Sequence, residues 1–402
     1  MRIALLTMIE PAGAGDGERR AFLRIGGQTI ARHQVALALK LECQRIICVG
    51  AGIGGRTTEL QKMAEGSGAR LEVVANVQEA AAGISDNDEM IALADGLFVG
   101  PGVPTSLREQ GFAVYVLHAD AASKGFERLD LEAAAAGIVH VPGRLATRLR
   151  ELPADYDAVS GLTRIALQSG IARRKLAVED QIGTIWKLVS SETEAQALEP
   201  EWLRLQLGNS SGGEPSRWLA RNAVMAFGPS LLHAGSGSRI SLAAFVAALL
   251  IGAFSIWFGL VWLALIVAAF AWILHHAAFM LVGAEEATHP GRNWTPIASL
   301  MAGCLVDLEI LFIVITASGM TEWPGLFGPA FPPIALLLLM RIVPKIIGHG
   351  GRGWMEDRAV LCLVLVAAHA FGIVLPCVEI LSVLFLIAAL ASIGARPRLT
   401  TA

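Results

Sequence analysis

Hydrophobic and polar residues follow two different patterns along this chain, and the change lies near Ile240. Up to about Ser238 the charged residues are dense and the apolar runs are short. From Ile240 onward charges occur only in short clusters between long apolar runs. Because a segment surrounded by lipid has to be apolar over about 20 residues, the second pattern predicts a membrane region. We therefore expect a soluble domain followed by a polytopic membrane domain.

The apolar runs predict about six transmembrane helices. The stretch Ile240–Leu274 carries no charge and is too long for one span, so we expect two helices of about 17 residues with a turn near Trp257-Phe258-Gly259. The other four spans are expected at about Pro296–Ser318, Leu326–Val343, Arg358–Leu375 and Pro376–Ile393. Asp307 and Glu309 fall within the third span, and Asp307 lies near mid-membrane, where an acid is costly and has a functional or polar structural role.

Basic residues mark every second connection between these spans. They are Arg217, Arg221 and Arg239 before the first span, Arg292 after the second, Arg341, Lys345, Arg352 and Arg358 around the fourth and fifth, and Arg396 and Arg398 after the sixth. The other three connections contain no Lys or Arg. Because basic loops stay in the cytoplasm, this alternation predicts an inner-membrane protein with both termini and the soluble domain in the cytoplasm.

A linker separates the two regions. The segment 208–215 is rich in Gly and Ser, and the residues after it have apolar positions that predict an amphipathic interfacial helix, with Trp218, Leu219, Val224 and Phe227 on its apolar side. We therefore expect an α/β domain at 1–207, a linker and interfacial helix at 208–238, and a transmembrane domain at 239–402.

The soluble region alternates between the patterns of strands and helices. Strands are expected at Arg2–Met8, Arg45–Val49, Arg70–Val74 and Met90–Ala94, with helices at about Thr29–Lys40 and Thr57–Glu65. This β-α-β alternation predicts a doubly wound, mainly parallel sheet that binds its ligand at the carboxyl ends of the strands.

Two glycine-rich loops compete as the ligand site. The first contains Gly13, Gly15 and Gly17, and Arg19 and Arg20 follow it, which suits a triphosphate. The second is Gly50-Ala-Gly-Ile-Gly-Gly55, which has the GxGxxG spacing of a dinucleotide-binding loop, with Glu72 at the next strand. That fingerprint usually follows the first strand of its unit, whereas this loop follows the second, so a plain strand-to-helix turn is the alternative.

The first half of the chain resembles the NTP-transferase superfamily of sugar-nucleotide and MobA-like nucleotidyltransferases. The resemblance is carried by the first glycine-rich loop, by Arg20-Ala-Phe-Leu-Arg-Ile-Gly-Gly-Gln-Thr-Ile30, by Ile91-Ala-Leu-Ala-Asp-Gly96, by Ala136-Gly-Ile-Val139 and by the closing segment 183–199. It implies that Asp95 is a metal-binding and catalytic acid, and that the glycine loop with Arg19 and Arg20 binds a nucleotide such as CTP. The chain departs from the family pattern at Arg20, where the family has Lys, in the order of the glycine loop, and at Leu188, where a second metal-binding Asp is expected.

The membrane half resembles the CDP-alcohol phosphotransferases, and above all their fusions with inositol-phosphate cytidylyltransferases. Gly303-Cys-Leu-Val-Asp307 matches the GxxxD part of that family's motif, whereas Leu311 takes the place of its final acid. Glu285 and Glu286 lie near the position of the first acid pair, and Arg292 stands for the motif's Arg.

The two resemblances together imply Mg²⁺ as a cofactor. Its ligands would be Asp95, Glu285, Glu286 and Asp307, with Asp95 and Asp307 as catalytic acids and Gly13, Gly15, Gly17, Arg19, Arg20 and Arg292 as binding residues. The expected substrates are a nucleotide and a lipid or phosphorylated polar alcohol, and a homodimer through the membrane domain remains an option.

Composition excludes several other classes of protein. The formal net charge of −3 argues against nucleic-acid binding, which needs a basic surface. The five cysteines form no CxxC pair, so neither a metal cluster nor a disulfide framework is expected. The GxSxG spacing occurs once, at Gly208-Asn-Ser-Ser-Gly212 in the linker, and not as an elbow after a predicted strand, which disfavours a hydrolase.

Three functions remain open at this stage. The first is a membrane-bound nucleotidyltransferase-like or CDP-alcohol phosphotransferase-like enzyme of phospholipid head-group or polar-alcohol phosphate metabolism. The second is an inactive paralogue that acts as a partner or regulator of an active lipid-biosynthesis enzyme, because acids are missing from the motifs of both halves. The third is a transporter with a nucleotide-sensing domain, suggested by the acids and prolines within the spans.

Overall fold

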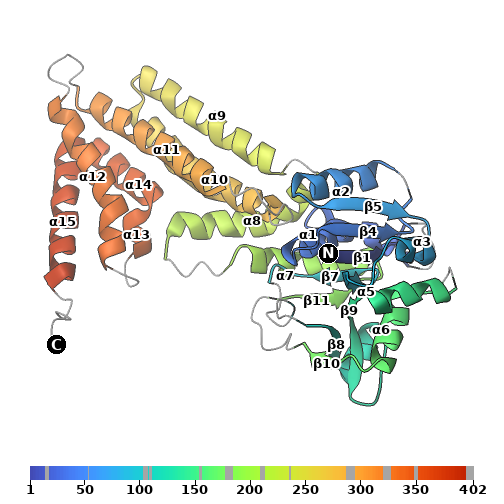
Figure 1. Ribbon diagram of the computed structural model, residues 1–402. Coiled ribbons are helices and arrows are strands. Elements are labelled where there is room, and N and C mark those ends of the chain that lie inside the picture. Colours follow the sequence, from blue (N-terminus) through green and yellow to red (C-terminus); the bar gives the residue numbers. More distant parts are fainter. Residues whose placement is uncertain are drawn as a thin grey trace, which may run out of the picture. The chain divides into compact units, whose positions relative to one another are not determined.

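The computed structural model of the 402-residue chain describes residues 1–13, 18–52, 54–102, 107, 111–153, 156–176, 184–208, 213–234, 237–286, 295–319, 327–347 and 352–394 (Figure 1). The chain divides into two compact units. The α/β unit comprises Met1–Gln206 with Ala284–Arg292, and the helical unit comprises Leu207–Gly283 with Asn293–Ala402.

A seven-stranded sheet forms the centre of the α/β unit. Its strands, in spatial order, are β10 (Arg173–Lys175), β8 (Ala113–His118), β9 (Ala133–Pro142), β6 (Glu89–Leu93), β1 (Arg2–Thr7), β4 (Arg45–Val49) and β5 (Arg70–Val74). Neighbours are parallel except where β9 pairs antiparallel with both β6 and β8. The prediction of a doubly wound, mainly parallel sheet is therefore confirmed.

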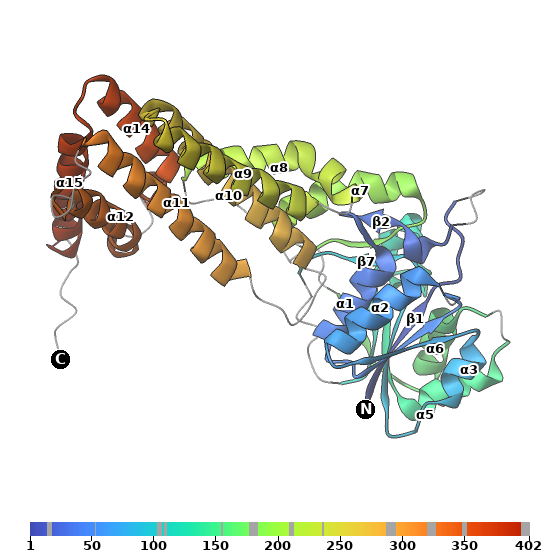
Figure 2. The ribbon, with the colours of Figure 1, turned by 90° about the horizontal axis from the view of Figure 1, so that it is seen from above.

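Helices cover both faces of this sheet (Figure 2). They are α1 (Ile30–Lys40), α2 (Gly55–Gly66), α3 (Val77–Ala82), α5 (Gly143–Ala146), α6 (Ala158–Gln168) and α7 (Glu192–Gln206), with short 3₁₀ turns η1 (Arg20–Phe22), η2 (Ala119–Lys124) and η3 (Thr147–Glu151). The start of α1 is fixed by Thr29, whose side chain accepts a hydrogen bond from the Arg32 N–H at 3.3 Å.

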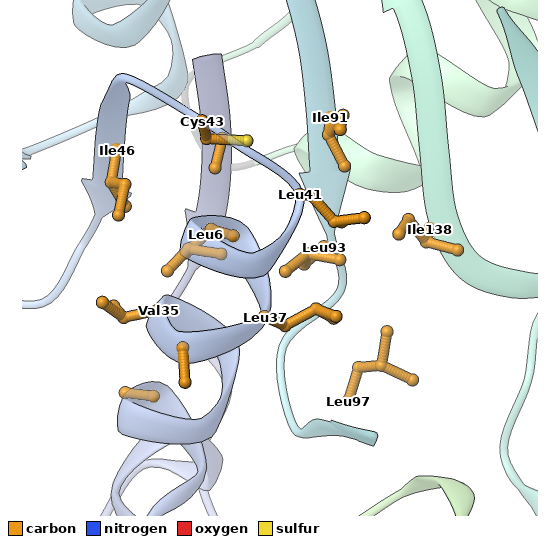
Figure 3. Close-up of a cluster of buried hydrophobic side chains, with 14 of the residues drawn as sticks. Leu6, Val35, Leu37, Leu41, Cys43, Ile46, Ile91, Leu93, Leu97 and Ile138 are labelled. Carbon is orange, nitrogen blue, oxygen red and sulfur yellow. The ribbon is translucent and has the colours of Figure 1, made fainter. Parts of the chain in front are cut away.

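Alternate residues of each central strand supply two separate hydrophobic cores, because successive side chains of a strand point to opposite faces. In β1, Ala4 and Leu6 belong to the core beneath α1 and α2, whereas Ile3 and Leu5 belong to the core beneath α3, α5 and α6. Figure 3 shows the first core, where Leu6 lies among side chains of α1 and neighbouring strands.

Two of the cysteines are part of this packing. Cys43 and Cys48 are buried in the first core, and burial raises the pKa of each thiol to about 12. Neither thiol is therefore ionised, or nucleophilic, near neutral pH.

Two small sheets complete the α/β unit. β7 (Leu97–Val99) pairs antiparallel with β11 (Trp186–Leu188), and β2 (Arg24–Ile25) pairs antiparallel with β3 (Gln28–Thr29). The β7–β11 pair brings a segment from near the end of the unit back to the strand that follows β6. The Trp186 Nε1–H fixes this return by donating a hydrogen bond of 2.9 Å to the backbone oxygen of Ala136 in β9.

The helical unit consists of α8 (Pro215–His233), α9 (Gly237–Trp257), α10 (Val261–Glu286), α11 (Thr295–Ala317), α12 (Phe327–Ile347), α13 (Arg352–Glu356), α14 (Arg358–Ala370) and α15 (Val374–Gly394). Five of these helices, α9, α10, α11, α12 and α15, are long and apolar enough to cross a membrane. The predicted turn near Trp257-Phe258-Gly259 separates α9 from α10, so the membrane-domain prediction is confirmed for these five spans.

The fifth predicted span, Arg358–Leu375, is a shorter helix than expected. It corresponds to α14, which has 13 residues. At about 1.5 Å per residue α14 is about 20 Å long, less than the roughly 30 Å of a hydrocarbon core. The run was overestimated because a turn at Phe371–Ile373 interrupts residues that are apolar throughout.

The helix predicted to lie at the membrane interface is α8. Its buried face is a stripe of Ser216, Ala220, Val224, Gly228 and Leu232. The exposed face carries the large apolar side chains Trp218, Leu219 and Phe227. Val224 was predicted to share the apolar face with these three, but it lies on the buried stripe instead. An exposed face of this composition suits the boundary between lipid and water.

Because α14 is short, the predicted topology can be tested by finding the side of the membrane on which the C-terminal end of α14 lies. If α14 crosses, Ile373 lies on the same outer side as Phe258. In a variant with the native cysteines replaced, we expect Phe258→Cys and Ile373→Cys to react with a membrane-impermeant maleimide added to intact cells. Lys62→Cys in the α/β unit should react only after the membrane is permeabilised. Protection of Ile373→Cys in intact cells would contradict the six-span topology.

Candidate functional site

The candidate site of the α/β unit lies where the order of the strands reverses. The chain leaves β1 for β4 on one side and returns to β6 on the other, so the loops after β1 and β6 diverge from the same edge of the sheet. Ligands of doubly wound proteins bind in the crevice at such a switch point. The loop after β1 contains Met8–Gly13, and the loop after β6 contains Asp95 and Gly96.

The Asp95 carboxylate joins these two loops. Its Oδ2 accepts hydrogen bonds from the backbone N–H groups of Ile9 at 2.6 Å and Glu10 at 2.7 Å. Its Oδ1 is buried and has no hydrogen-bond partner within the described part of the chain. Burial raises the pKa of Asp95 to about 6, against the lowering effect of the two N–H groups. One carboxylate oxygen therefore holds the loop after β1, and the other is buried without a partner among the described residues.

The first glycine-rich loop is anchored around this carboxylate. The Gly13 N–H donates to the Ser190 oxygen at 3.0 Å, and the Arg19 guanidinium donates to the Met8 oxygen at 3.0 Å. Arg20 donates from Nε to the Pro11 oxygen at 3.3 Å. Gly15 and Gly17 lie outside the described residues. The structure thus brings Gly13, Arg19, Arg20 and Asp95 together, as the sequence predicts.

Gly96 makes the close approach of the closing segment possible. Its φ of +72° favours glycine, and a Cβ at this position would lie 2.4 Å from the Val189 backbone oxygen. The Val189 N–H in turn donates to the Gly96 oxygen at 2.8 Å. The residue that follows Asp95 therefore has to be glycine for the segment after β11 to reach the site.

A cavity of about 680 Å³ opens beside this junction. Three cations, Arg20, Lys124 and Lys187, lie on its wall together with Glu194, which accepts hydrogen bonds from the Ser190 N–H and hydroxyl at 2.8 and 2.9 Å. A cavity of this size with an excess of cations suits a phosphorylated small molecule.

Sequence reasoning missed two of these cations. Lys187 lies in the closing segment next to Leu188, and both residues line this cavity, so the motif position of Leu188 could have indicated its neighbour. Lys124 ends the 3₁₀ turn η2 and belongs to no motif. Its place on the wall of the cavity is visible only in the structure, where η2 brings Lys124 beside Lys187 and Arg20.

Leu188 occupies the position where the resemblance calls for a second acid. It lines the large cavity and also a smaller adjoining one of about 120 Å³. The smaller cavity contains Glu127, which forms an ion pair with Arg164 at 2.9 Å, and Asp157, which caps the start of α6. The acids of the smaller cavity are therefore already engaged.

The second glycine-rich loop forms a strand-to-helix turn between β4 and α2. A Cβ on Gly50 would lie 2.5 Å from a side-chain carbon of Ile9, so this glycine is required for the packing of two neighbouring loops. Glu72, the acid expected to bind a ribose, forms ion pairs with Arg45 at 2.6 Å and Arg70 at 2.8 Å. The structure therefore favours the plain turn over a dinucleotide site.

Asp307 is the centre of a polar cluster in the helical unit. Its Oδ2 accepts from the Arg341 guanidinium at 2.5 and 3.0 Å, and its Oδ1 accepts from Arg358 Nε at 2.9 Å. The Arg358 side chain is only 5% exposed and lies over the Trp272 ring at 5.1 Å. Both oxygens of this carboxylate are thus held by guanidinium groups rather than left for a metal.

Further polar side chains adjoin the cluster. Asp357 accepts from the Ser216 N–H at 2.8 Å and caps the start of α14, which ties α8 to α14. His275 and His276 pack against Trp272, and His276 lies 3.9 Å from the Glu214 carboxylate. This polar region of the bundle was not predicted, because its members are separated along the chain.

The remaining predicted residues of the membrane site are dispersed. Glu285 and Glu286 are the last residues of α10, where both are half-buried, and they fall within the α/β unit. Arg292 lies outside the described residues. Among the described residues, no group of three or more His, Cys, Asp or Glu side chains could hold a metal ion. The predicted ligands Asp95 and Asp307 also belong to different units.

The fold and the site define a protein with a doubly wound α/β domain and a helical domain whose helices suit a membrane. No family model and no curated protein matches the chain. A solved structure, the inositol-1-phosphate CTP transferase from T. maritima, is similar with a TM-score of 0.37 and 12% sequence identity, over 48% of this chain and 91% of that chain. A similarity at this level does not assign a function.

The raised pKa of Asp95 makes a prediction for the stability of the α/β unit. The unfolded carboxyl titrates near pH 4 and the folded one near pH 6, so the folded state binds the extra proton between these values and stability falls as the pH rises through this window. Asp95→Asn keeps an acceptor for Ile9 and Glu10 but cannot ionise. At pH 8 the variant should be more stable by up to about 3 kcal/mol, with no difference near pH 4.

The measurement is thermal or urea unfolding of the full chain in detergent, followed at several pH values. Asp157→Asn is the control, because Asp157 also caps backbone N–H groups. A variant Asp95→Asn that is less stable than the parent at pH 8 would show that the ionised carboxylate is stabilising and would contradict this assignment.

The Asp307 cluster predicts an asymmetry between its members. Removing the carboxylate in Asp307→Asn leaves two guanidinium groups without their counter-charge, and should destabilise the helical unit by about 3–5 kcal/mol. Arg341→Gln leaves Asp307 paired with Arg358 and should lower the stability of the helical unit far less. Thermal unfolding in lipid nanodiscs compares the two, with Glu379→Gln on the exposed face of α15 as control. Equal stability of Asp307→Asn and the parent would count against the ion pairs and in favour of a metal or substrate role.

Proposed function

We propose that this protein is a membrane-anchored, nucleotidyltransferase-like protein that binds a nucleotide such as CTP in the cleft of its α/β unit. Its place would be in phospholipid head-group or polar-alcohol phosphate metabolism. The observation that carries the proposal is the junction at Asp95, a carboxylate with one unpartnered oxygen whose neighbour Gly96 is hydrogen-bonded to Val189 on the wall of a cationic cavity of about 680 Å³.

The cavity supplies the charge that a nucleotide needs. Arg20 has a planar guanidinium that can bind two phosphate oxygens, and Lys124 and Lys187 add point charges from the opposite segments of the wall. Gly13 in the loop after β1 has a φ of +69°, and no atom of the described residues lies within 4 Å of the place where its side chain would be. A phosphate group could therefore approach the backbone of this loop closely.

Magnesium fits this site through Asp95. Mg²⁺ is commonly held by one or two carboxylates together with substrate phosphates and water. The buried, unpartnered Oδ1 of Asp95 can provide one such ligand. When bound, the ion would neutralise charge on the phosphates, while Arg20 would orient them and the Ile9 and Glu10 N–H groups would hold the carboxylate in place.

The helical unit supports the link to lipids. It supplies five helices that suit a membrane, an α8 helix with exposed Trp218 and Phe227, and a buried polar cluster around Asp307 within the bundle. We infer that the basic connections lie in the cytoplasm of an inner membrane, where soluble nucleotides and phosphorylated alcohols are available. A lipid or a phosphorylated alcohol would then be the second ligand.

The proposal predicts that CTP with Mg²⁺ raises the unfolding temperature of the full chain, because a ligand stabilises the state that binds it. Arg20→Gln and Lys187→Gln should each weaken binding about tenfold through the loss of one charge-assisted contact. Lys62→Gln on the exposed face of α2 removes the same charge away from the cavity and should bind as the parent does. ATP, GTP and UTP are tested in parallel to identify the base.

Failure of every nucleoside triphosphate to bind the parent protein would contradict the proposal. Equal weakening by Lys62→Gln would show that binding depends on net charge and not on the cavity. Release of pyrophosphate with a phosphorylated alcohol, lost in Asp95→Asn, would establish turnover.

A second function is supported by two other observations. Leu188 stands where a second acid is expected, and the Asp307 oxygens are engaged by Arg341 and Arg358. These features favour a binding protein that partners or regulates an active lipid-biosynthesis enzyme. Nucleotide binding without pyrophosphate release, across a panel of phosphorylated alcohols, is the result that would distinguish it from the enzyme.

A further inference from the structure

Glu309 is a buried acid that belongs neither to the candidate site of the α/β unit nor to the Asp307 cluster. It lies near the middle of α11 and is 7% exposed. Neither of its carboxyl oxygens has a hydrogen-bond partner within the described part of the chain. An ionised carboxylate without a partner is very costly in an apolar interior, and the cost is greater within a membrane.

The side chain of Glu309 points at the backbone of α9. A Cβ built on Gly252 would lie 1.7 Å from its Oε1, so the carboxyl group fills the space that any other residue at position 252 would occupy. The buried face of α9 consists of Gly237, Ser241, Phe245, Ala248, Gly252 and Ser255. These mostly small side chains let the backbone of α9 approach its neighbour closely, as in other packed membrane helices.

The charges that surround Glu309 are engaged elsewhere. On α11 itself Asp307 holds Arg341 of α12 and Arg358 of α14. The buried Cys362 thiol of α14 is close enough to Glu309 to interact with it electrostatically. Arg239, near the start of α9, is more than three helical turns from Gly252, and Glu379 of α15 is exposed. No cation among the described residues therefore compensates an ionised Glu309.

From this geometry we propose that Glu309 is a proton-binding site within the membrane domain, and that its neutral carboxyl group allows α9 to pack closely against α11. The ligand is a proton, and the site is formed by the Glu309 side chain with the backbone of α9 at Gly252. As a neutral acid the group gains an O–H donor. The missing side chain at Gly252 leaves the space that the carboxyl group occupies beside the backbone of α9.

The protonated acid can be observed directly in the infrared spectrum. The C=O stretch of a neutral carboxylic acid is separate from the bands of carboxylates, and Asp95, whose pKa is raised to about 6, is ionised at pH 8. We expect full-length protein in lipid bilayers at pH 8 to show this band. Glu309→Gln, which keeps the shape and the neutral charge of the protonated acid, should abolish it without lowering the unfolding temperature. Glu59→Gln on the exposed face of α2, outside the membrane-spanning helices, should leave the band unchanged.

A second variant tests the role of Gly252. Gly252→Ala places a methyl group where the carboxyl lies, so it should lower the unfolding temperature and shift or remove the band. Gly283→Ala in α10 is the control, because no atom lies within 4 Å of the added carbon. Combining Gly252→Ala with Glu309→Ala should restore part of the lost stability, because the smaller side chain makes room for the methyl group.

The proposal is overturned by either of two results. One is the absence of a neutral-acid band from the parent protein at pH 8. The other is a band that persists in Glu309→Gln. An unfolding temperature of Glu309→Gln well below that of the parent would also count against it, because it would mean that the charged form is the stabilising one.

Discussion

The candidate site of the α/β unit depends on one buried carboxylate, which accepts hydrogen bonds from two backbone N–H groups. Oδ2 of Asp95 fixes the loop after β1, and Gly96 beside it admits the segment after β11. These contacts bring Gly13, Arg20 and the cationic wall to one edge of the sheet. Oδ1 of Asp95 is left buried and unpartnered. An unpartnered oxygen of this kind costs free energy unless a ligand uses it, which is the physical basis for placing the cation of a nucleotide there.

A different constraint acts on the helical unit, because in lipid every polar group needs a partner within the protein. Asp307 forms ion pairs with two guanidinium groups, and Asp357 accepts hydrogen bonds from backbone N–H groups at the starts of α8 and α14. These contacts hold together helices that are distant in sequence. They also engage both oxygens of Asp307 with guanidinium groups, which is why the Asp307 cluster enters the proposal as a structural element and not as a metal site.

Much of the architecture could be predicted from the sequence, because strand runs, glycine loops and apolar spans are local signals. The strands β1, β4, β5 and β6, the role of Asp95 at a loop after β6, and the turn between α9 and α10 are of this kind. Contacts between distant residues could not be predicted. Arg341 and Arg358 lie 34 and 51 positions from Asp307, and Lys124 reaches the cavity from a turn without a motif. The length of α14 was overestimated because apolar residues on both sides of a turn give one continuous run.

The central claim is that Asp95 and the cationic cavity bind a nucleotide together with a divalent cation. Electron paramagnetic resonance of Mn²⁺, which replaces Mg²⁺ in many such sites, tests it most directly with full-length protein and CTP. The account predicts a bound-manganese spectrum that requires both the protein and the nucleotide and is lost in Asp95→Asn, while Asp307→Asn, where it folds, retains it. A spectrum that does not change when Asp95 is replaced would contradict the account.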